Sequence, residues 1–427
     1  MTPMRNARGW LAALAASLAL LQSPAEAATT AISLGQSVQS AIAAAAPGDV
    51  LTLRAGRYDG VVVVDKPLTL TGEPGATIVG PGAGSVITVN APDVAIRALT
   101  ITGSGIGPEG MDSGVFLTQG AARALVEGNR IENNLIGVFI HGAPDAIVRG
   151  NIIEGRQDLR MNDAGNSIYV WNAPGAAVIG NDLRYGRDGI YVISSRKNVF
   201  RDNRMRDLRF AVHYMYTNDS EVSGNISVGN HAGFNIMYSD RLKVTGNLSL
   251  GDRDKGFLFD YANMSVIAGN VVKAAPEKCL FLFNANKNQI RDNWFEGCDI
   301  GIHFTAGSVR NKISGNAFIG NRTQVKYVGT TYLDWSDKGR GNYWSDNPAF
   351  DLNGDGIADT AYRPNDLVDE VLWTAPSAKV LVNSPAVQMI RWAQTQFPAL
   401  YPGGVVDSAP LMAPPAIPVP AWTVLTQ

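Results

Sequence analysis

The chain has 427 residues and a formal charge of −2 at pH 7, and 45% of its residues are hydrophobic while 17% are charged. This composition excludes an intrinsically disordered chain, and it provides no surplus of basic residues for binding nucleic acid. The 45 glycines and the low content of charged residues are typical of an all-β protein with many turns.

Residues 1–27 have the features of a secretory signal peptide. Arg5 and Arg8 precede an apolar stretch, Trp10–Leu21, that is too short to span a bilayer, and a small-residue cleavage site follows at Ala25–Ala27. A membrane anchor is the alternative. We therefore expect the mature protein to be exported to the periplasm.

The segment after the leader begins with a helix and continues with short strands. Val38–Ala46 is expected to form a short helix that covers the open end of a stack of strands. Short alternating apolar runs follow it, among them VLTLRAG, LTLTG and SVITV. Such alternation is typical of strands.

A repeat of 22 or 23 residues then organises the chain. It is marked by Gly-Asn or Asp-Asn pairs, with one interval of 30 residues that we interpret as a 22-residue coil with an eight-residue loop inserted within Gly155–Asn166. The asparagines of these pairs are Asn129, Asn151, Asn181, Asn203, Asn225, Asn247, Asn270, Asn293 and Asn316.

This repeat predicts an all-β fold, a right-handed single-stranded parallel β-helix of about 12 coils over residues 28–326. One or two short strands would lie in each coil, and the coils would stack into one continuous core. The repeated asparagines are expected to form a structural ladder along one turn, because Asn tolerates left-handed backbone and its amide can bond neighbouring backbone groups.

Each coil also contains an alternating apolar run of the same phase, such as VHY after Ala211 and FNI after Gly233. The first and third residues of each run are apolar in every coil and are expected to face the core, Tyr214 among them. The second and fourth residues then face outward, and they are aromatic, His or Met where Thr, Ser, Lys or Glu would be usual.

An exposed apolar surface of this kind usually marks a binding surface. The alternative is that a loop or the C-terminal segment covers it and makes a second small core. The residues predicted to form a partner surface are Tyr169, Trp171, Tyr191, Tyr216, Tyr238, Phe281 and Phe283.

Imidazole and thioether groups on one outer face favour copper, and thioethers favour Cu(I) in particular. In the middle coils His213 and Met215 lie one coil from Asn235 and Met237. The candidate copper ligands are His213, Met215, Met237 and His303.

Cys279 and Cys298 are the two cysteines of the chain. Disulfides persist in exported proteins. The pair is therefore either a structural disulfide or two buried thiols, and its spacing does not decide between these alternatives.

Residues 327–376 are expected to form a C-terminal cap. The segment DLNGDGIAD, Asp351–Asp359, resembles the start of an EF-hand loop with Gly356 at the sixth position, which predicts a structural calcium site; an Asx-rich turn without metal is the alternative. The candidate calcium ligands are Asp351, Asn353, Asp355, Ile357 through its carbonyl, and Asp359.

Residues 377–427 are expected to form a helix and a Pro-rich tail. Ser384–Phe397 reads as a helix with Ser384 as N-cap and Pro385 in the first turn. The prolines after Tyr401 favour an extended tail that no other segment covers.

The sequence shows no constellation typical of an enzyme. No repeated pair of carboxylates lies on the strands, and the charges of RDGIY (Arg187–Tyr191) and GDRDKG (Gly251–Gly256) lie near turns, where we expect them to be solvated. This favours a binding protein that is not an enzyme. A β-helix polysaccharide lyase, hydrolase or epimerase is the alternative.

Several segments resemble the NosD family, among them RFAVHYMYTND, GFNIMYSDRLKVTGN, GDRDKGFLFDYAN and GRGNYWSDNPAFDLNGDGIADTAYRPND. The resemblance covers nearly all of the chain after the leader. It implies a non-catalytic periplasmic accessory protein for the maturation of nitrous-oxide reductase.

The same resemblance implies the partners. These are an ABC transporter made of the ATPase NosF and the membrane subunit NosY, the copper chaperone NosL, and the apo reductase, whose catalytic copper–sulfide centre receives copper. It also implies that ATP is hydrolysed by the partner ATPase and that the chain meets the membrane only through its partners.

Overall fold

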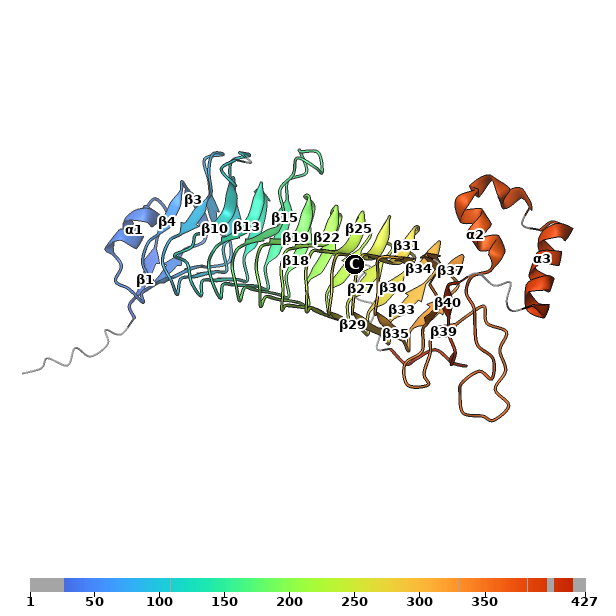
Figure 1. The fold of residues 1–427 in the computed structure, drawn as a ribbon. Coiled ribbons are helices and arrows are strands. Elements are labelled where there is room, and N and C mark those ends of the chain that lie inside the picture. Colours follow the sequence, from blue (N-terminus) through green and yellow to red (C-terminus); the bar gives the residue numbers. More distant parts are fainter. Residues whose placement is uncertain (1–26, 108, 330, 382, 398–402, 418–427) are drawn as a thin grey trace, which may run out of the picture.

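The computed structural model describes residues 27–107, 109–329, 331–381, 383–397 and 403–417. The predicted signal peptide lies outside these ranges except for Ala27. The chain forms a long, gently curved rod with α1 (Val38–Ala44) at one end and both α2 (Leu367–Thr374) and α3 (Pro385–Gln396) at the other (Figure 1). None of the helices in the described ranges is long and apolar enough to cross a membrane.

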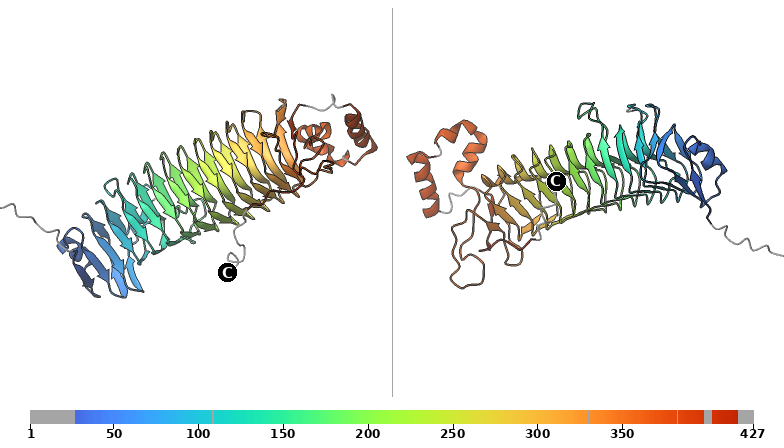
Figure 2. Two further views of the ribbon diagram at one scale, coloured as in Figure 1. Left: turned by 90° about the horizontal axis from the view of Figure 1, so that it is seen from below. Right: turned by 180° about the vertical axis from the view of Figure 1, so that it is seen from behind.

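Three parallel sheets run the length of the rod, and we name them A, B and C in the order in which the chain enters them. The stacking of their strands is also seen from below and from behind in Figure 2. The 13 strands of sheet A are β1 (Thr29–Ile32), β2 (Val50–Leu53), β5 (Thr69–Gly72), β8 (Ala95–Arg97), β11 (Leu125–Glu127), β14 (Ile147–Arg149), β17 (Ala177–Ile179), β20 (Val199–Arg201), β23 (Glu221–Ser223), β26 (Lys243–Thr245), β29 (Val266–Ala268), β32 (Gln289–Arg291) and β35 (Lys312–Ser314).

Sheet B contains mostly strands of three or four residues. Its 13 strands are β3 (Gly56–Asp59), β6 (Ala76–Val79), β9 (Thr100–Thr102), β12 (Arg130–Asn134), β15 (Ile152–Gly155), β18 (Asp182–Arg184), β21 (Arg204–Arg206), β24 (Ile226–Val228), β27 (Leu248–Leu250), β30 (Val271–Lys273), β33 (Trp294–Glu296), β36 (Ala317–Ile319) and β39 (Tyr343–Trp344).

Sheet C contains the longest strands, most of them six residues from β13 onward. Its 12 strands are β4 (Val62–Val64), β7 (Ile87–Val89), β10 (Ser113–Leu117), β13 (Ile136–His141), β16 (Ile168–Trp171), β19 (Asp188–Ile193), β22 (Phe210–Met215), β25 (Ala232–Met237), β28 (Lys255–Asp260), β31 (Lys278–Phe283), β34 (Ile300–Thr305) and β37 (Thr323–Val328).

The predicted all-β parallel β-helix is confirmed, but two details of the prediction were wrong. Each coil contributes one strand to each sheet, so a full coil has three strands rather than one or two, and the 13 strands of sheets A and B exceed the 12 coils expected. The additional strands escaped notice because three residues are too few to show an alternating pattern. The inserted loop lies where it was expected, between β15 and β16, and it projects from the rod (Figure 1).

The core lies inside the rod and is filled by the residues predicted to face inward. Val212 and Tyr214 of β22 are both 0% exposed, and so are Phe234 and Ile236 of β25. Because each strand pairs with the equivalent strand of the next coil, like side chains stack: the Phe234 and Phe257 rings lie 4.6 Å apart. One continuous core therefore runs along the rod.

The predicted asparagine ladder is confirmed, and it runs along the turn that precedes sheet B. Asn225 shows the pattern: its Oδ1 accepts the backbone N–H of Asn203 at 3.1 Å, and its Nδ2 donates to the carbonyl of Phe200 at 2.8 Å and to Asn247 Oδ1 at 3.0 Å. The ladder consists of Asn129, Asn151, Asn181, Asn203, Asn225, Asn247, Asn270, Asn293, Asn316 and Asn342.

The reason given for these asparagines was partly wrong. In the nine predicted pairs the left-handed backbone belongs to the residue before the asparagine, for example Gly224 with φ 63° and Asp202 with φ 58°. Glycine adopts this conformation without a steric cost, and aspartate adopts it more readily than most residues. In the Gly-Asn pair the first residue therefore makes the turn, and the second supplies the hydrogen bonds.

The described part of the Pro-rich tail is not uncovered, which corrects the prediction. β40 (Val405–Val406) pairs with β38 (Leu333–Asp334), and Asp407 is 0% exposed. Asp407 Oδ2 accepts the backbone N–H of Asn342 at 2.6 Å and the indole N–H of Trp344 at 2.8 Å. The tail is held because its carboxylate satisfies the last donors of the asparagine ladder.

The helices at the two ends have well-defined starts. Ser37 caps α1, and Val38 and Ile42 are buried against the first coil, so the predicted N-terminal cap is confirmed. Ser384 caps α3 with Pro385 in its first turn, also as predicted.

The segment before α3 contains two elements that the sequence analysis missed, α2 and the 3₁₀ helix η1 (Pro376–Leu381). A capping box between Asp366 and Asp369 begins α2. Arg391 Nε lies 2.8 Å from Asp366 Oδ2 and links α3 to α2. These elements were missed because they are too short to show a helical pattern.

The two cysteines form a disulfide, which decides between the two alternatives left by their spacing. The Cα–Cα distance between Cys279 and Cys298 is 5.7 Å.

Asp252 of GDRDKG is 0% exposed and accepts hydrogen bonds from Ser227 and Ser249, so the expectation that its charge is solvated was wrong. Burial raises the pKa of Asp252 to about 6.

Replacement of a central ladder residue tests how much the ladder stabilises the rod. Asn225→Ala leaves the buried backbone N–H of Asn203 without its acceptor and removes the side-chain bonds to the Phe200 carbonyl and to Asn247. We expect the free energy of unfolding to fall by about 2–4 kcal/mol. The measurement is urea unfolding followed by circular dichroism.

The matched control is Asn90→Ala, because Asn90 is exposed and its side chain only accepts from Thr118 Oγ1. The control is expected to change the unfolding free energy by no more than about 0.5 kcal/mol. Equal losses in the two variants would contradict the role given to the ladder.

Candidate functional site

The outer face of sheet C carries two rows of side chains that follow the rod axis. The second residue of each apolar run contributes to one row, which we call the aromatic row; it begins with Phe116 and Phe139. Each ring of the row lies against the next: Tyr169 and Tyr191 are 4.9 Å apart, and Tyr191 and His213 are 4.8 Å apart. The register of sheet C places these residues directly opposite one another on adjacent strands.

His213 is held in place by a buried ion pair. Its Nδ1 lies 3.0 Å from Asp188 Oδ2, and Arg209 contacts both Asp188 oxygens at 2.8 and 2.7 Å. Burial disfavours the charged form of Asp188, but hydrogen bonds from His213 and Arg209 outweigh it and hold the pKa of Asp188 below its usual value. The ionised Asp188 accepts a hydrogen bond from Nδ1–H of His213, so in the neutral ring Nε2 is the nitrogen with a free lone pair.

The fourth residue of each apolar run contributes to a second row, which we call the thioether row and which lies beside the aromatic row. Met215 and Met237 are directly paired on β22 and β25, as are His213 and Asn235. Met215 Sδ is also 4.0 Å from the Tyr191 hydroxyl. The structure therefore brings together three of the four candidate copper ligands, His213, Met215 and Met237.

Two more polar groups border this set. Asp260 follows Met237 in the thioether row, and burial raises the pKa of Asp260. Its Oδ1 and the Nδ2 of Asn235 are buried, and neither has a hydrogen-bond partner in the described part of the chain. Asn235 is 1% exposed, so the expectation that the second positions face solvent does not hold in this coil.

His303 does not belong to this set. It lies on β34, four strands from His213 on β22, which corresponds to roughly 19 Å at the usual strand spacing. It stacks on Phe281 with ring centroids 4.6 Å apart, and its Nδ1 is buried without a partner among the described residues. One copper ion could not contact both His213 and His303.

Three exposed tyrosines stack on one another, and each comes directly after a residue of the thioether row in the chain. Tyr216 and Tyr238 are 51% and 41% exposed, and their rings lie 5.0 Å apart. Tyr261 continues the stack at 5.2 Å from Tyr238. All three have φ near 48°, a left-handed conformation that is uncommon for bulky residues and that clusters at functional sites.

The rest of the predicted partner surface is exposed to different degrees. Trp171 and Phe283 are 37% and 39% exposed, whereas Tyr169, Tyr191 and Phe281 are half-buried. At the other end of the aromatic row Phe139 is 3% exposed and packs in a small separate cluster with Leu135 and Ile136. Leu159 of the inserted loop packs against this cluster, so a loop covers the face there, as the alternative interpretation held.

The oxygens of the candidate calcium loop bond the loop's own backbone. Asp351 accepts the backbone N–H groups of Gly354 at 2.7 Å and Gly356 at 2.8 Å, and Asp359 accepts that of Leu352 at 2.8 Å. Asn353 and Asp355 make similar bonds to Asp355 and Ile357. Across the described ranges, no three His, Cys, Asp or Glu residues lie close enough together to hold a metal ion. The calcium site stays a prediction.

Three residues of the site were missed from the sequence. Asp188 was interpreted as part of a solvated cluster near a turn, but it is 0% exposed, and Arg209 pairs with it from the next coil. No signal in the repeat marks Asp188, because its counterparts on the next two strands are Phe210 and Ala232 and no carboxylate repeats at this position. Tyr261 could have been found from its spacing of 23 residues from Tyr238.

Comparisons with known proteins show the family of the chain. Residues 149–349 match the family model described as "Periplasmic copper-binding protein (NosD)". The chain is 40% identical over 377 residues to a protein of Stutzerimonas stutzeri named "Probable ABC transporter binding protein NosD", covering 85% of this chain and 86% of that one. The chain belongs to the NosD family. A Pseudomonas aeruginosa relative of the same name is 39% identical over 378 residues, covering 86% of this chain and 88% of that one.

Among solved structures, the rod is similar to a family 28 exopolygalacturonase of Yersinia enterocolitica. The TM-score is 0.49 at 11% identity, covering 71% of this chain and 77% of that one. A likeness of this level bears on neither activity nor substrate. The names of the NosD relatives describe binding rather than catalysis.

The protonation of His303 can be measured directly in this NosD family member. Burial, together with the positive charges of Lys326 and Lys278, lowers the pKa of His303 to about 4. We therefore expect the ring to stay neutral from pH 7 down to pH 5. The measurement is an NMR titration of its ring resonances, assigned with His303→Gln.

The control is the same chain unfolded in urea, where an unperturbed His titrates near about 6.5. The neutral ring favours the folded state, so this contribution to stability is complete above the unfolded pKa and is lost as the pH falls towards 4. Titration of the folded His303 above pH 6 would contradict the burial seen in the structure.

Proposed function

We propose that this protein binds copper on the outer face of sheet C and serves, in the periplasm, an ABC-transporter-linked machine that matures nitrous-oxide reductase. The observation that carries the proposal is the grouping of His213, Met215 and Met237 on two adjacent strands. The family description, which names a periplasmic copper-binding protein, supports it.

The chemistry of the three side chains suits Cu(I). Thioethers are soft ligands that select Cu(I), and a neutral imidazole adds a stronger nitrogen ligand. Metal-binding histidines usually donate their second ring N–H to a carboxylate, and Asp188 provides this contact to Nδ1 of His213. The buried Arg209–Asp188 pair would thus hold the imidazole with Nε2 directed to the metal.

The family and the surface beside the site support the proposed partners. The relatives are named as probable ABC transporter binding proteins, which supports an association with a transporter. We propose the ATPase NosF and the membrane subunit NosY as that transporter, and NosL and the apo reductase as copper donor and acceptor. The exposed rings of Tyr216, Tyr238 and Tyr261 would form a docking surface next to the copper ligands.

The accessory role implies that this chain does no catalysis and that ATP is hydrolysed by NosF. A periplasmic location is supported by the predicted leader and by the disulfide between Cys279 and Cys298, since disulfides persist in that compartment. Nucleic acid is not expected as a partner, because the net charge is only −2.

Cu(I) titration against a competing chelator tests the proposed ligands. The combination His213→Gln, Met215→Leu and Met237→Leu removes all three donor atoms while it keeps similar side-chain volumes. We expect this variant to lose stoichiometric Cu(I) binding. His213→Gln alone should weaken the affinity by about 10-fold or more.

The matched control is His231→Gln with Met264→Leu, which removes an exposed imidazole and a thioether that is 44% exposed. The control should bind Cu(I) like the wild type. Wild-type affinity in the triple variant would place any copper site elsewhere.

Maturation in cells tests the functional role separately from metal binding. We expect the nitrous-oxide reductase purified from cells with the triple variant to lack the copper of its catalytic centre, although the variant is folded and exported. Purification of the wild-type chain should also recover NosF and NosY. Normal reductase copper with the triple variant, together with no recovery of the transporter, would refute the proposal.

A further inference from the structure

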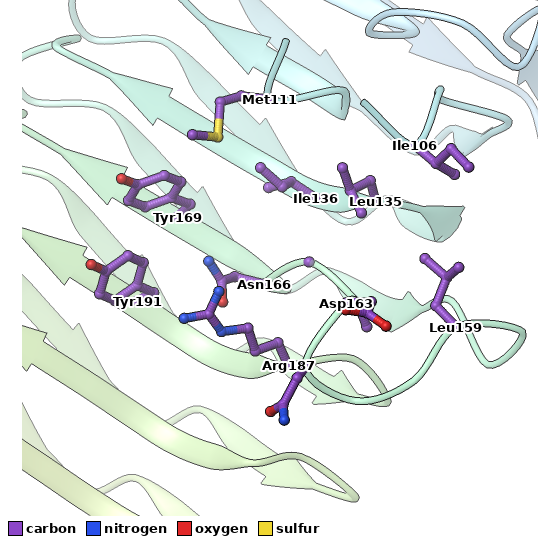
Figure 3. Close-up of a pocket in the computed structure, with 13 residues that line it drawn as sticks. Ile106, Met111, Leu135, Ile136, Leu159, Asp163, Asn166, Tyr169, Arg187 and Tyr191 are labelled. Atoms are coloured by element: carbon purple, nitrogen blue, oxygen red, sulfur yellow. The ribbon is translucent and has the colours of Figure 1, made fainter. Parts of the chain in front are cut away.

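A pocket of about 550 Å³ lies beside the aromatic row, between the two loops that project from the rod near β10 and β15. Figure 3 shows its lining residues. Pockets of this size commonly take small organic ligands. The copper proposal does not use this pocket, although Tyr191 lines it and also contacts His213.

One side of the pocket carries polar atoms that have no partner among the described residues. Arg187 is half-buried and makes no ion pair with any of them, and its Nε is buried without an acceptor. Asn166 is 8% exposed, and its Oδ1 is buried without a donor. In Figure 3 the Arg187 side chain extends toward Asn166 and Tyr191. A buried N–H without an acceptor is costly, and an anionic ligand on Arg187 would supply one.

Two tyrosine rings, Tyr169 and Tyr191, line the pocket beside this guanidinium. Their hydroxyls point away from Arg187 in Figure 3, and the Tyr191 hydroxyl lies 4.0 Å from Met215 Sδ. The faces of these rings are occupied, because Tyr169 and Tyr191 stack on each other at 4.9 Å and on their neighbours in the row. The pocket therefore offers ring edges rather than a flat platform for stacking a sugar.

The opposite side of the pocket is apolar. Leu135 and Ile136 form its wall, with Leu159 from the inserted loop and Ile106 from the loop before β10. Asp163 also lines the pocket, but it is exposed and lies on the Leu159 side, away from the guanidinium (Figure 3). The pocket thus combines an apolar wall with one positive charge that has no ion-pair partner among the described residues.

We propose that this pocket binds a monocarboxylate that carries an apolar group, with the carboxylate on Arg187 and the apolar group against Leu135 and Ile136. A planar guanidinium pairs with a carboxylate through two parallel hydrogen bonds. The Nδ2 group of Asn166, which also lines the pocket, is a further donor for the same anion. The carboxylate belongs either to a free small acid or to the C-terminus of a peptide that ends in an apolar residue.

Calorimetric titration of the metal-free protein with four probes tests this site. The probes are hexanoate, hexanamide, and the peptide N-acetyl-Ala-Ala-Ala-Leu with a free or an amidated C-terminus. At least one carboxylate probe should bind with a Kd of about 1 mM or tighter, and its amide should bind at least 10-fold more weakly. Equal affinity for hexanoate and the peptide would indicate a free acid, and tighter binding of the peptide would indicate a chain end.

Variants identify the binding group. Arg187→Met should weaken carboxylate binding at least 10-fold without unfolding the protein, because the Nε that it removes has no partner. Tyr169→Phe keeps the ring stack and removes a hydroxyl that points away from Arg187, so it should bind the carboxylate like the wild type. Arg204→Met on the exposed side of β21 is the matched control and should bind like the wild type.

The proposal is overturned if neither carboxylate binds, if an amide binds as tightly as its acid, or if Arg187→Met binds like the wild type. None of these results depends on copper, because the titrations use metal-free protein. Loss of carboxylate binding and loss of copper binding can therefore be told apart.

Discussion

The asparagine ladder keeps each coil in the same register as the next. Asn225, at its centre, both donates to Asn247 and accepts from Asn203, and one such residue in each coil passes the pattern along the rod. Buried amides without partners would be costly, so a shift of one coil against another would break several bonds together. The ladder ends on Asp407, which brings the tail back to the rod.

The site on sheet C depends on this register. Because the coils are aligned, Met215 is directly beside Met237, and His213 is within reach of Asp188 from the preceding coil. A slip of one residue would turn every outward side chain of a strand into the core. The rod thus acts as a rigid support on which a few outward residues can be placed next to each other without a loop or a hinge.

Repetition explains which features could be predicted from the sequence. The ladder, the inward positions and the pairing of Met215 with Met237 all follow from a period of 22 or 23 residues, and the structure confirms them. The pairing of Asp188 with Arg209 and the return of Asp407 are single contacts without a period, and periodicity carries no information about them.

Two further predictions failed, one on the burial of aspartates and one on the distance between two histidines. Asp188 and Asp252 appeared to be solvated because they are charged and lie near turns, yet each is fully buried with partners from another coil. His303 shares the phase of His213, and only the count of strands shows that the two are too far apart for one ion. The position of a residue within the repeat predicts which face of the rod its side chain lies on. The number of coils between two such residues determines how far apart they are.

X-ray absorption spectroscopy of the Cu(I)-loaded protein is the most direct test that copper is bound by His213, Met215 and Met237. Binding by these three side chains would give copper one imidazole nitrogen and two sulfur neighbours, and both sulfur neighbours should disappear in the variant with Met215→Leu and Met237→Leu. A copper environment of nitrogen and oxygen alone, or sulfur neighbours that persist in that variant, would show that these side chains do not bind the ion.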